Sequence, residues 1–256
     1  VMAGRWRRYW DNVLHEASLR RWTRIARQAA TADLDALRAD QMRDRSLSRH
    51  LAEVMFVADA RLALPRIGSN AFALPPGTDW SWRPDLWRGP LPEQGIAGVT
   101  NRTELGDEVK VFHDCPRSEI SLRQIRNRGA ADLAPFAVAL DVFGFDGSFL
   151  SLAIELPPDA AQGLRTRHLV RVEVTAQQDR HVEMFARLNI RHGPNTEQLV
   201  QEFRAGGSTV EFDLAYTNLN EKRVEALWLD LIIDKPAMNR IVFKDLTFSR
   251  YPRADL

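Results

Sequence analysis

Apolar and polar residues alternate with a period of two through most of the chain beyond residue 103. This alternation is typical of β-strands with one buried face. In residues 136–156 two alternating segments flank Phe145-Asp146-Gly147, which predicts a β-hairpin over 136–143 and 148–156 with Gly147 in the left-handed region. Its aliphatic face would need a second sheet to cover it. Further strands are predicted at Glu108–Asp114, Glu119–Asn127, His168–Ala176, Val182–Arg191, Leu199–Phe203, Thr209–Tyr216, Ala226–Asp234 and Asn239–Arg250.

The predicted strands are short and are separated by turns rich in glycine, proline and asparagine. This pattern indicates a mainly β protein whose residues 101–256 form an antiparallel, jelly-roll-like β-sandwich. No helical pattern of useful length interrupts the strands. A parallel α/β fold is therefore not expected.

The N-terminal part of the chain has a different periodicity. Residues 4–29 repeat apolar positions three or four apart, and a second such segment runs to about Leu62, before Pro65. We therefore predict an αα-hairpin as a helical arm over 1–64. Residues 65–100 are rich in proline, glycine and tryptophan and are predicted to form an irregular connector to the sandwich.

Composition narrows the function only to a broad class. The chain has 256 residues, of which 45% are hydrophobic and 27% charged, and a net charge of +1, which gives no general attraction to nucleic acid. Cys115 is the one cysteine, so an intrachain disulfide framework is excluded. Neither a membrane span nor a signal peptide is recognisable in the sequence, and the expected location is the cytoplasm.

The charge is unevenly distributed, since residues 1–29 contain seven arginines against Asp11 and Glu16. One interpretation is an amphipathic arm that docks to a protein partner, to a copy of itself or, peripherally, to a membrane. The other is a helix that packs its tryptophan stripe on its own domain and leaves the arginines in solvent. Under the first interpretation the contact residues are Trp6, Trp10 and Trp22.

Two groups of residues are candidates for ligand binding. Trp80, Trp82 and Trp87 lie within eight residues of the connector; they would stack on a sugar ring or, alternatively, close the open end of the core. Arg187, Asn189 and Arg191 share one strand face, where their planar donors match sugar hydroxyls or carboxylates. The alternative for this second group is a solvated outer face with salt bridges to a neighbouring strand.

The predicted hairpin adds Asp141 to the ligand-binding candidates, because its polar face carries Asp141 together with Glu155. A pair of carboxylates would permit glycoside hydrolysis only if both faced one cleft, which a sequence does not show.

Catalytic and metal-binding motifs are not recognised. His113, Asp114 and Cys115 are adjacent, but neighbours on a strand point to opposite faces and Pro116 ends the strand, so we expect no catalytic site. The histidine spacing does not fit zinc, and no segment resembles a calcium-binding EF-hand loop or a phosphate loop. We therefore expect no cofactor, and a structural calcium has no support from spacing.

The strands from about 136 to 251 resemble the jelly-roll sandwiches of carbohydrate-binding modules and galactose-binding-like domains. The segments that carry this resemblance are GSFLSLAIELP, HLVRVEVTA, ALWLDLIID and NRIVFKDLTFSR. The whole chain resembles an uncharacterised family of alphaproteobacterial proteins, through WSWRPDLWRGP, VFHDCPRSEISLRQIRN, FDGSFLSLAIELP, ARLNIRHGPN and NRIVFKDLTFSRYPRADL. The first resemblance implies glycan binding, and neither implies a catalytic residue.

These observations predict a non-catalytic binding protein. The sandwich would recognise a glycan or glycoconjugate, and the helical arm would dock to a partner or to itself. The alternative is a structural or assembly component that makes only protein contacts. A carbohydrate-active enzyme is the third hypothesis.

Overall fold

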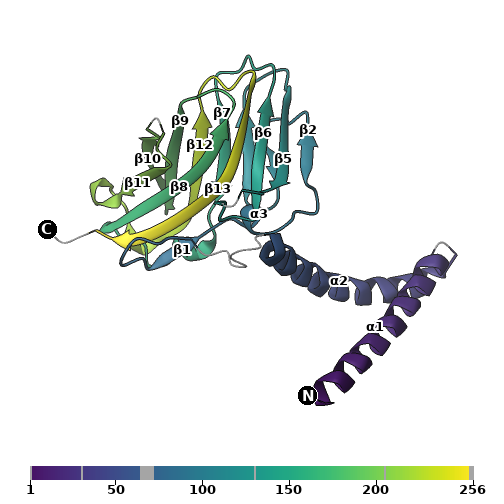
Figure 1. Cartoon of the computed structure of the whole chain (residues 1–256). Helices are drawn as coiled ribbons and strands as arrows, with labels where there is room; N and C mark the ends of the chain where they lie inside the picture. Colours follow the sequence, from purple (N-terminus) through teal and green to yellow (C-terminus); the bar gives the residue numbers. More distant parts are fainter. Residues whose placement is uncertain (1, 30, 64–71, 130, 205, 254–256) are drawn as a thin grey trace. The chain divides into compact units, whose positions relative to one another are not determined.

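The computed structural model describes residues 2–29, 31–63, 72–129, 131–204 and 206–253 (Figure 1). It divides into two compact units, Val1–Met55 and Phe56–Leu256. The first contains helix α1 (Met2–Gln28) and most of helix α2 (Leu34–Ala63). The second contains the β-sandwich.

The prediction of two N-terminal helices is confirmed. Thr31 N donates a hydrogen bond to Gln28 O in the turn between them, and Asp33 Oδ2 accepts one from Asp35 N at 3.2 Å as α2 begins. A carboxylate at this place satisfies a backbone donor that has no partner within the helix. Among the described helices, none combines the length and apolar character needed to cross a bilayer.

Two antiparallel sheets form the sandwich, which confirms the predicted fold class (Figure 1). The six-stranded sheet has the order β10-β9-β12-β7-β4-β3, and the seven-stranded sheet has the order β11-β8-β13-β6-β5-β2 with β1 paired to β13. The bounds are β1 Trp80–Trp82, β2 Gly95–Ala97, β3 Thr103–Leu105, β4 Val109–His113, β5 Ile120–Arg126, β6 Phe136–Val142, β7 Leu150–Glu155, β8 His168–Gln178, β9 Met184–His192, β10 Asn195–Glu202, β11 Thr209–Asp213, β12 Val224–Ile233 and β13 Asn239–Pro252.

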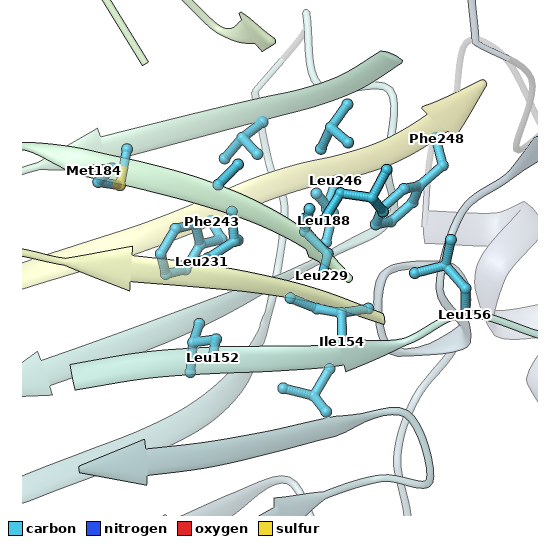
Figure 2. Packing of buried hydrophobic residues seen from close by; sticks show 14 of the residues in the cluster. Leu152, Ile154, Leu156, Met184, Leu188, Leu229, Leu231, Phe243, Leu246 and Phe248 are labelled. Atoms are coloured by element: carbon cyan, nitrogen blue, oxygen red, sulfur yellow. The ribbon is translucent and has the colours of Figure 1, made fainter. Parts of the chain in front are cut away.

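The core lies between the sheets and is built by the alternation seen in the sequence (Figure 2). In β9 and β12 the inward residues, such as Leu188 and Leu229, are fully buried. They pack in one cluster with Phe243 and Phe248 of the opposite sheet. Burying each such side chain contributes roughly 1.5–3 kcal/mol. The intervening residues of the same strands form the outer face of the six-stranded sheet.

The predicted hairpin over 136–156 is wrong. β6 pairs with β5 and β13 of one sheet, whereas β7 pairs with β4 and β12 of the other. Residues 143–149 cross from sheet to sheet, so the aliphatic sides of β6 and β7 contribute to one core from opposite layers. Alternation fixes which side of a strand is buried, but it does not say whether two such strands lie side by side or face to face.

Gly147 has a different role in this crossing from the one predicted, because it is not among the glycines with a left-handed backbone. A Cβ at Gly147 would lie 2.5 Å from Asp114 Oδ1 and 2.9 Å from Cys115 N. The absent side chain lets Asp114 approach and accept hydrogen bonds from Ser148 N at 2.7 Å and Phe149 N at 3.2 Å. Glycine is therefore needed for close approach.

The segment predicted as an irregular connector is partly regular. Residues 80–97 hold β1, the short helix α3 (Asp85–Arg88) and β2, and both strands join the seven-stranded sheet. Strands of three residues are too short to show alternation between prolines and glycines, which is why the sequence pattern did not reveal them.

Candidate binding groove on the six-stranded sheet

A groove of about 680 Å³ lies on the outer face of the six-stranded sheet. Its size falls within the range of sites for small ligands. On β7 its lining contains the small side chains of Ser151 and Ala153, whereas the neighbouring strands carry Phe112, Lys110 and Trp228. A hollow forms because small residues lie between large ones on one continuous, hydrogen-bonded surface.

The strand registers place the lining residues in rows across the sheet. One row runs Gln198, Asn189, Trp228 and Glu155 through β10, β9, β12 and β7. The next row runs Arg187, Asp230, Ala153 and Lys110 through β9, β12, β7 and β4. Directly opposed residues of neighbouring strands have Cβ atoms about 4.5–5.5 Å apart, so adjacent members of a row can be in contact.

Asp230 is the centre of the polar network in the groove, with a side chain only 8% exposed. Its Oδ2 accepts hydrogen bonds from Arg187 Nε at 2.9 Å and from Asn189 Nδ2 at 2.8 Å. Asn189 Oδ1 in turn accepts from Gln198 Nε2 at 3.0 Å. A buried carboxylate must be paired and hydrogen-bonded to be tolerated, and this network meets that demand while fixing three side chains in place.

Ser151, in the same surface, has a buried hydroxyl group whose hydrogen-bonding capacity is not used by the described residues. Its side chain is 5% exposed, and within the described residues its Oγ atom has no hydrogen-bond partner. A buried hydroxyl without a partner costs about 1–3 kcal/mol. Ser151 lines the groove, but its Oγ atom is itself covered by neighbouring protein atoms.

Cations at two further positions along the groove are held by carboxylates. Lys110 Nζ lies 2.7 Å from Glu155 Oε1 and 3.4 Å from Glu104 Oε1, and the hydrogen bond to Glu155 is the main reason why the pKa of Lys110 is raised. Arg191 Nε donates to Glu225 Oε2 at 3.1 Å. The charges along the groove are thus locally paired.

The three residues predicted to share one face of a strand all line the groove: Arg187, Asn189 and Arg191 of β9. Asn189 is 1% exposed and serves mainly to hold Asp230 and Gln198 in position. Asp141 does not join them. It lies on β6 of the other sheet, where its carboxylate is 2.7 Å from Arg123 Nη2 and 3.5 Å from Arg240 Nε.

The three connector tryptophans also lie apart from the groove. Trp87 is buried at 1% exposure, and its Nε1 donates to Phe243 O at 2.9 Å, so it has no surface on which a ligand could stack. Trp82 packs on Phe248 with ring centroids 5.4 Å apart, and Trp80 is half-buried on the same strand. This placement corresponds to the interpretation in which these side chains close the core.

In the arm, Trp22 is half-buried, and the Arg21 guanidinium lies 5.4 Å from its ring centroid. Trp6 and Trp10 lie in α1, but their side chains are outside the described residues.

The residues of the His–Asp–Cys segment make separate local contacts. A ring nitrogen of His113 lies 3.0 Å from Val99 O, and Cys115 Sγ lies 2.9 Å from Asp146 Oδ1. Asp114 holds the 143–149 crossing, as described above. Across the described residues no group of three or more His, Cys, Asp or Glu side chains is placed to hold a metal ion.

Sequence reasoning missed Trp228, Asp230 and Ser151 as site residues. The alternation of β12 does place Trp228 and Asp230 on the face opposite the buried leucines, and this signal would have marked them as outer-face residues. Their pairing with Arg187 and Asn189 depends on which strands are neighbours, which no local pattern contains.

A family model matches residues 2–256 of the sequence. The chain belongs to DUF6478, a family of unknown function. None of the curated proteins matches this DUF6478 sequence.

Several solved structures are similar to parts of the chain. A xylan-binding domain of carbohydrate-binding module family 22 has 9% identity and a TM-score of 0.34, over 72% of the DUF6478 chain and 99% of the domain. The module TmCBM61, solved with β-1,4-galactotriose, has 13% identity and a TM-score of 0.32, over 57% and 90%. The active domain of tailspike protein 4 of bacteriophage CBA120 has 4% identity and a TM-score of 0.41, over 60% of this chain and only 21% of its own. At these identities the likeness concerns the fold alone.

Proposed function

We propose that the groove on the six-stranded sheet binds a carbohydrate chain without altering it chemically. The observation that carries this proposal is the placement of the half-buried Trp228 next to a fixed polar network: Trp228 is paired with Asn189, and Asn189 is bonded to Asp230 of the next row. A sugar ring has apolar C–H faces and a rim of hydroxyl groups. An aromatic ring matches the first, and fixed donors and acceptors match the second.

The polar groups of the groove suit hydroxyl groups in particular. A hydroxyl donates one hydrogen bond and accepts others, so it fits between a carboxylate oxygen and a guanidinium or amide N–H. The network bonds of Asp230 described above all go to Oδ2, which leaves Oδ1 as an acceptor for a ligand hydroxyl. Since the network is already ordered, binding would lose little side-chain entropy.

The charge balance supports a neutral glycan. Lys110, Arg187 and Arg191 line the groove together with Glu155 and Asp230, and each cation is bonded to a carboxylate. A polyanionic ligand would have to displace these internal partners, which a neutral sugar does not.

The same pairing supports binding without catalysis. Glycoside hydrolysis by a carboxylate pair needs one carboxyl group that is held protonated. In this groove Glu155 is bonded to Lys110 and Asp230 to Arg187, so both carboxylates are engaged with cations.

A glycan array with the full chain, followed by calorimetry on the best ligand, tests the proposal. We expect a neutral oligosaccharide to bind and Trp228→Ala to weaken its binding about tenfold or more. Phe143→Ala is the matched control, because Phe143 is 57% exposed but lies outside the groove. Absence of any bound glycan, or equal affinity of wild type and Trp228→Ala, would reject it.

A second candidate, an assembly component, is favoured by one separate observation. Phe143 and Met238 are 57% and 70% exposed, and Met238 N donates to Phe143 O at 2.9 Å, which places two apolar side chains on adjacent loops. Exposed apolar clusters are typical of protein contacts. Under this hypothesis light scattering gives a discrete oligomer that Met238→Ser dissociates, and the array stays blank.

A further inference from the structure

The helix α1 carries one stripe whose two halves have different chemistry. Positions spaced alternately four and three residues apart lie on one face of a helix. On α1 this spacing connects Trp6, Trp10, Val13, Ala17, Arg20, Arg24 and Arg27. The first half of the stripe is apolar and the second half is made of arginines.

The arginine half of the stripe is an accessible cationic surface. Arg20, Arg24 and Arg27 are exposed and line one shallow groove together with Leu19. Arg20 is bonded to Glu16 at 3.0 Å, whereas Arg24 and Arg27 have no acidic partner within the described part of the chain. The apolar half continues this exposure, since Val13 is 41% exposed and Leu14 beside it 63%.

The excess of positive charge is confined to α1. Met2–Gln28 contains seven arginines against two acidic residues, whereas Leu34–Ala63 contains five arginines against five acidic residues. The whole chain has a net charge of only +1. An anionic partner would therefore be attracted to α1 and not to the chain as a whole.

We propose that α1 lies on the surface of an anionic lipid bilayer along this stripe. Interfacial helices place apolar and tryptophan residues at the boundary between headgroups and acyl chains, and their arginines among the lipid phosphates. The two halves of the stripe meet these two demands. This inference is independent of the proposed glycan groove.

A bilayer matches both halves of the stripe, whereas nucleic acid and a second copy of the helical arm each match only one half. Nucleic acid would neutralise the arginines but would give the apolar half no complementary surface. A second copy of the helical arm would cover the apolar half, but it offers few carboxylates for Arg24 and Arg27, because α2 has as many arginines as acidic residues. Arginines buried without partners would destabilise such a pair.

Vesicle sedimentation with the full chain tests the inference. We expect binding to equimolar phosphatidylcholine–phosphatidylglycerol vesicles, little binding to phosphatidylcholine alone, and a decrease as salt is raised. The double variant Arg24→Glu/Arg27→Glu should lower the bound fraction about tenfold or more. Arg45→Glu/Arg49→Glu on α2 is the matched control with the same change in charge, and its binding should fall far less.

Circular dichroism separates a lost contact from a lost helix. If the glutamate variant is less helical than wild type, Arg24→Gln/Arg27→Gln, which keeps good helix-forming residues, provides the decisive comparison. Absence of vesicle binding, equal binding to both vesicle types or equal losses in the α1 and α2 variants would each overturn the inference. A discrete oligomer that dissociates in the α1 variant, with no vesicle binding, would do the same and would assign the stripe to a second copy. Trp228→Ala should leave vesicle binding unchanged, so failure of the groove proposal is read separately.

Discussion

Asp230 and Asn189 lie on neighbouring strands, and the Asn189 Nδ2 donates to Asp230 Oδ2 at 2.8 Å on the outer face of the six-stranded sheet. The same carboxylate oxygen accepts from Arg187 Nε at 2.9 Å. One buried acidic group therefore orders the polar side of the groove.

The first prediction concerns the Asp230–Arg187 pair. Asp230→Asn should lower the free energy of unfolding by about 1–3 kcal/mol, because it removes the charge that holds Arg187 and Asn189. Arg187 is 38% exposed and solvent compensates it partly, which keeps the loss below that of a fully buried pair. Urea unfolding of Asp230→Asn, Arg187→Met and the double variant measures the coupling. Additive effects of the two single changes would show that the residues are not coupled.

The second prediction uses the unpartnered hydroxyl of Ser151. In the free protein Ser151→Ala should raise the free energy of unfolding by up to about 1 kcal/mol, since it removes a buried polar group without a partner. The same change should leave glycan affinity nearly unchanged, because the Oγ atom is covered by neighbouring protein atoms and out of reach of a ligand. Thermal unfolding and calorimetry on one preparation measure both effects. Lower stability of Ser151→Ala would contradict this prediction, because it would mean that the hydroxyl makes a favourable contact in the folded chain.

The third prediction is a pH dependence set by Glu108. Burial, assisted by the Asp85 carboxylate, raises the pKa of Glu108 from 4.5 to about 7, although Asp85 N donates to its Oε2 at 2.7 Å. A carboxyl group with a higher pKa in the folded chain binds its proton more tightly when folded. Its contribution to stability is therefore complete below pH 4.5 and is lost as the pH rises to about 7.

Glu108→Gln should remove this pH dependence. Between pH 4.5 and about 7 the free energy of unfolding of the wild type should fall by at most about 3 kcal/mol relative to that of Glu108→Gln. Glu93→Gln, a change at an exposed residue, is the control. Parallel stability profiles of wild type and Glu108→Gln between pH 4 and 8 would contradict the assignment.

The fourth prediction tests the crossing between the sheets. Gly147→Ala should lower the free energy of unfolding by about 1–3 kcal/mol, because the new methyl group meets Asp114 Oδ1 and Cys115 N at 2.5 and 2.9 Å. In a chain that already carries Asp114→Ala, Gly147→Ala should lower the free energy of unfolding by less than it does in the wild type. A neutral effect of Gly147→Ala would show that Asp114 and Cys115 do not approach this position closely.

The strands and the fold class could be predicted because alternation is a local property. β12 and β9 show it clearly, and their inward leucines fill the core as expected. The relation between β6 and β7 could not be predicted in this way. Their patterns are compatible with pairing in one sheet and with facing each other across the core, and the choice depends on strands distant in sequence.

The parts of the candidate site that depend on one strand could be predicted, and the parts that depend on strand pairing could not. The alternation along β9 places Arg187, Asn189 and Arg191 on one face of the strand, and all three line the groove. Asp141 was assigned to the site through a hairpin that does not form. It lies on β6 of the seven-stranded sheet, away from the groove. Trp228 and Asp230 enter the groove only through the register of β12 with β9, which is a non-local relationship.

The most direct test of the central claim is a map of backbone amide chemical shifts during titration of the full chain with the best glycan from the array. The groove predicts shifts concentrated in β7, β9 and β12 around Ser151, Asn189 and Trp228. Shifts that instead cluster at residues 80–87 or around Asp141 would contradict it and would move the ligand to the other sheet.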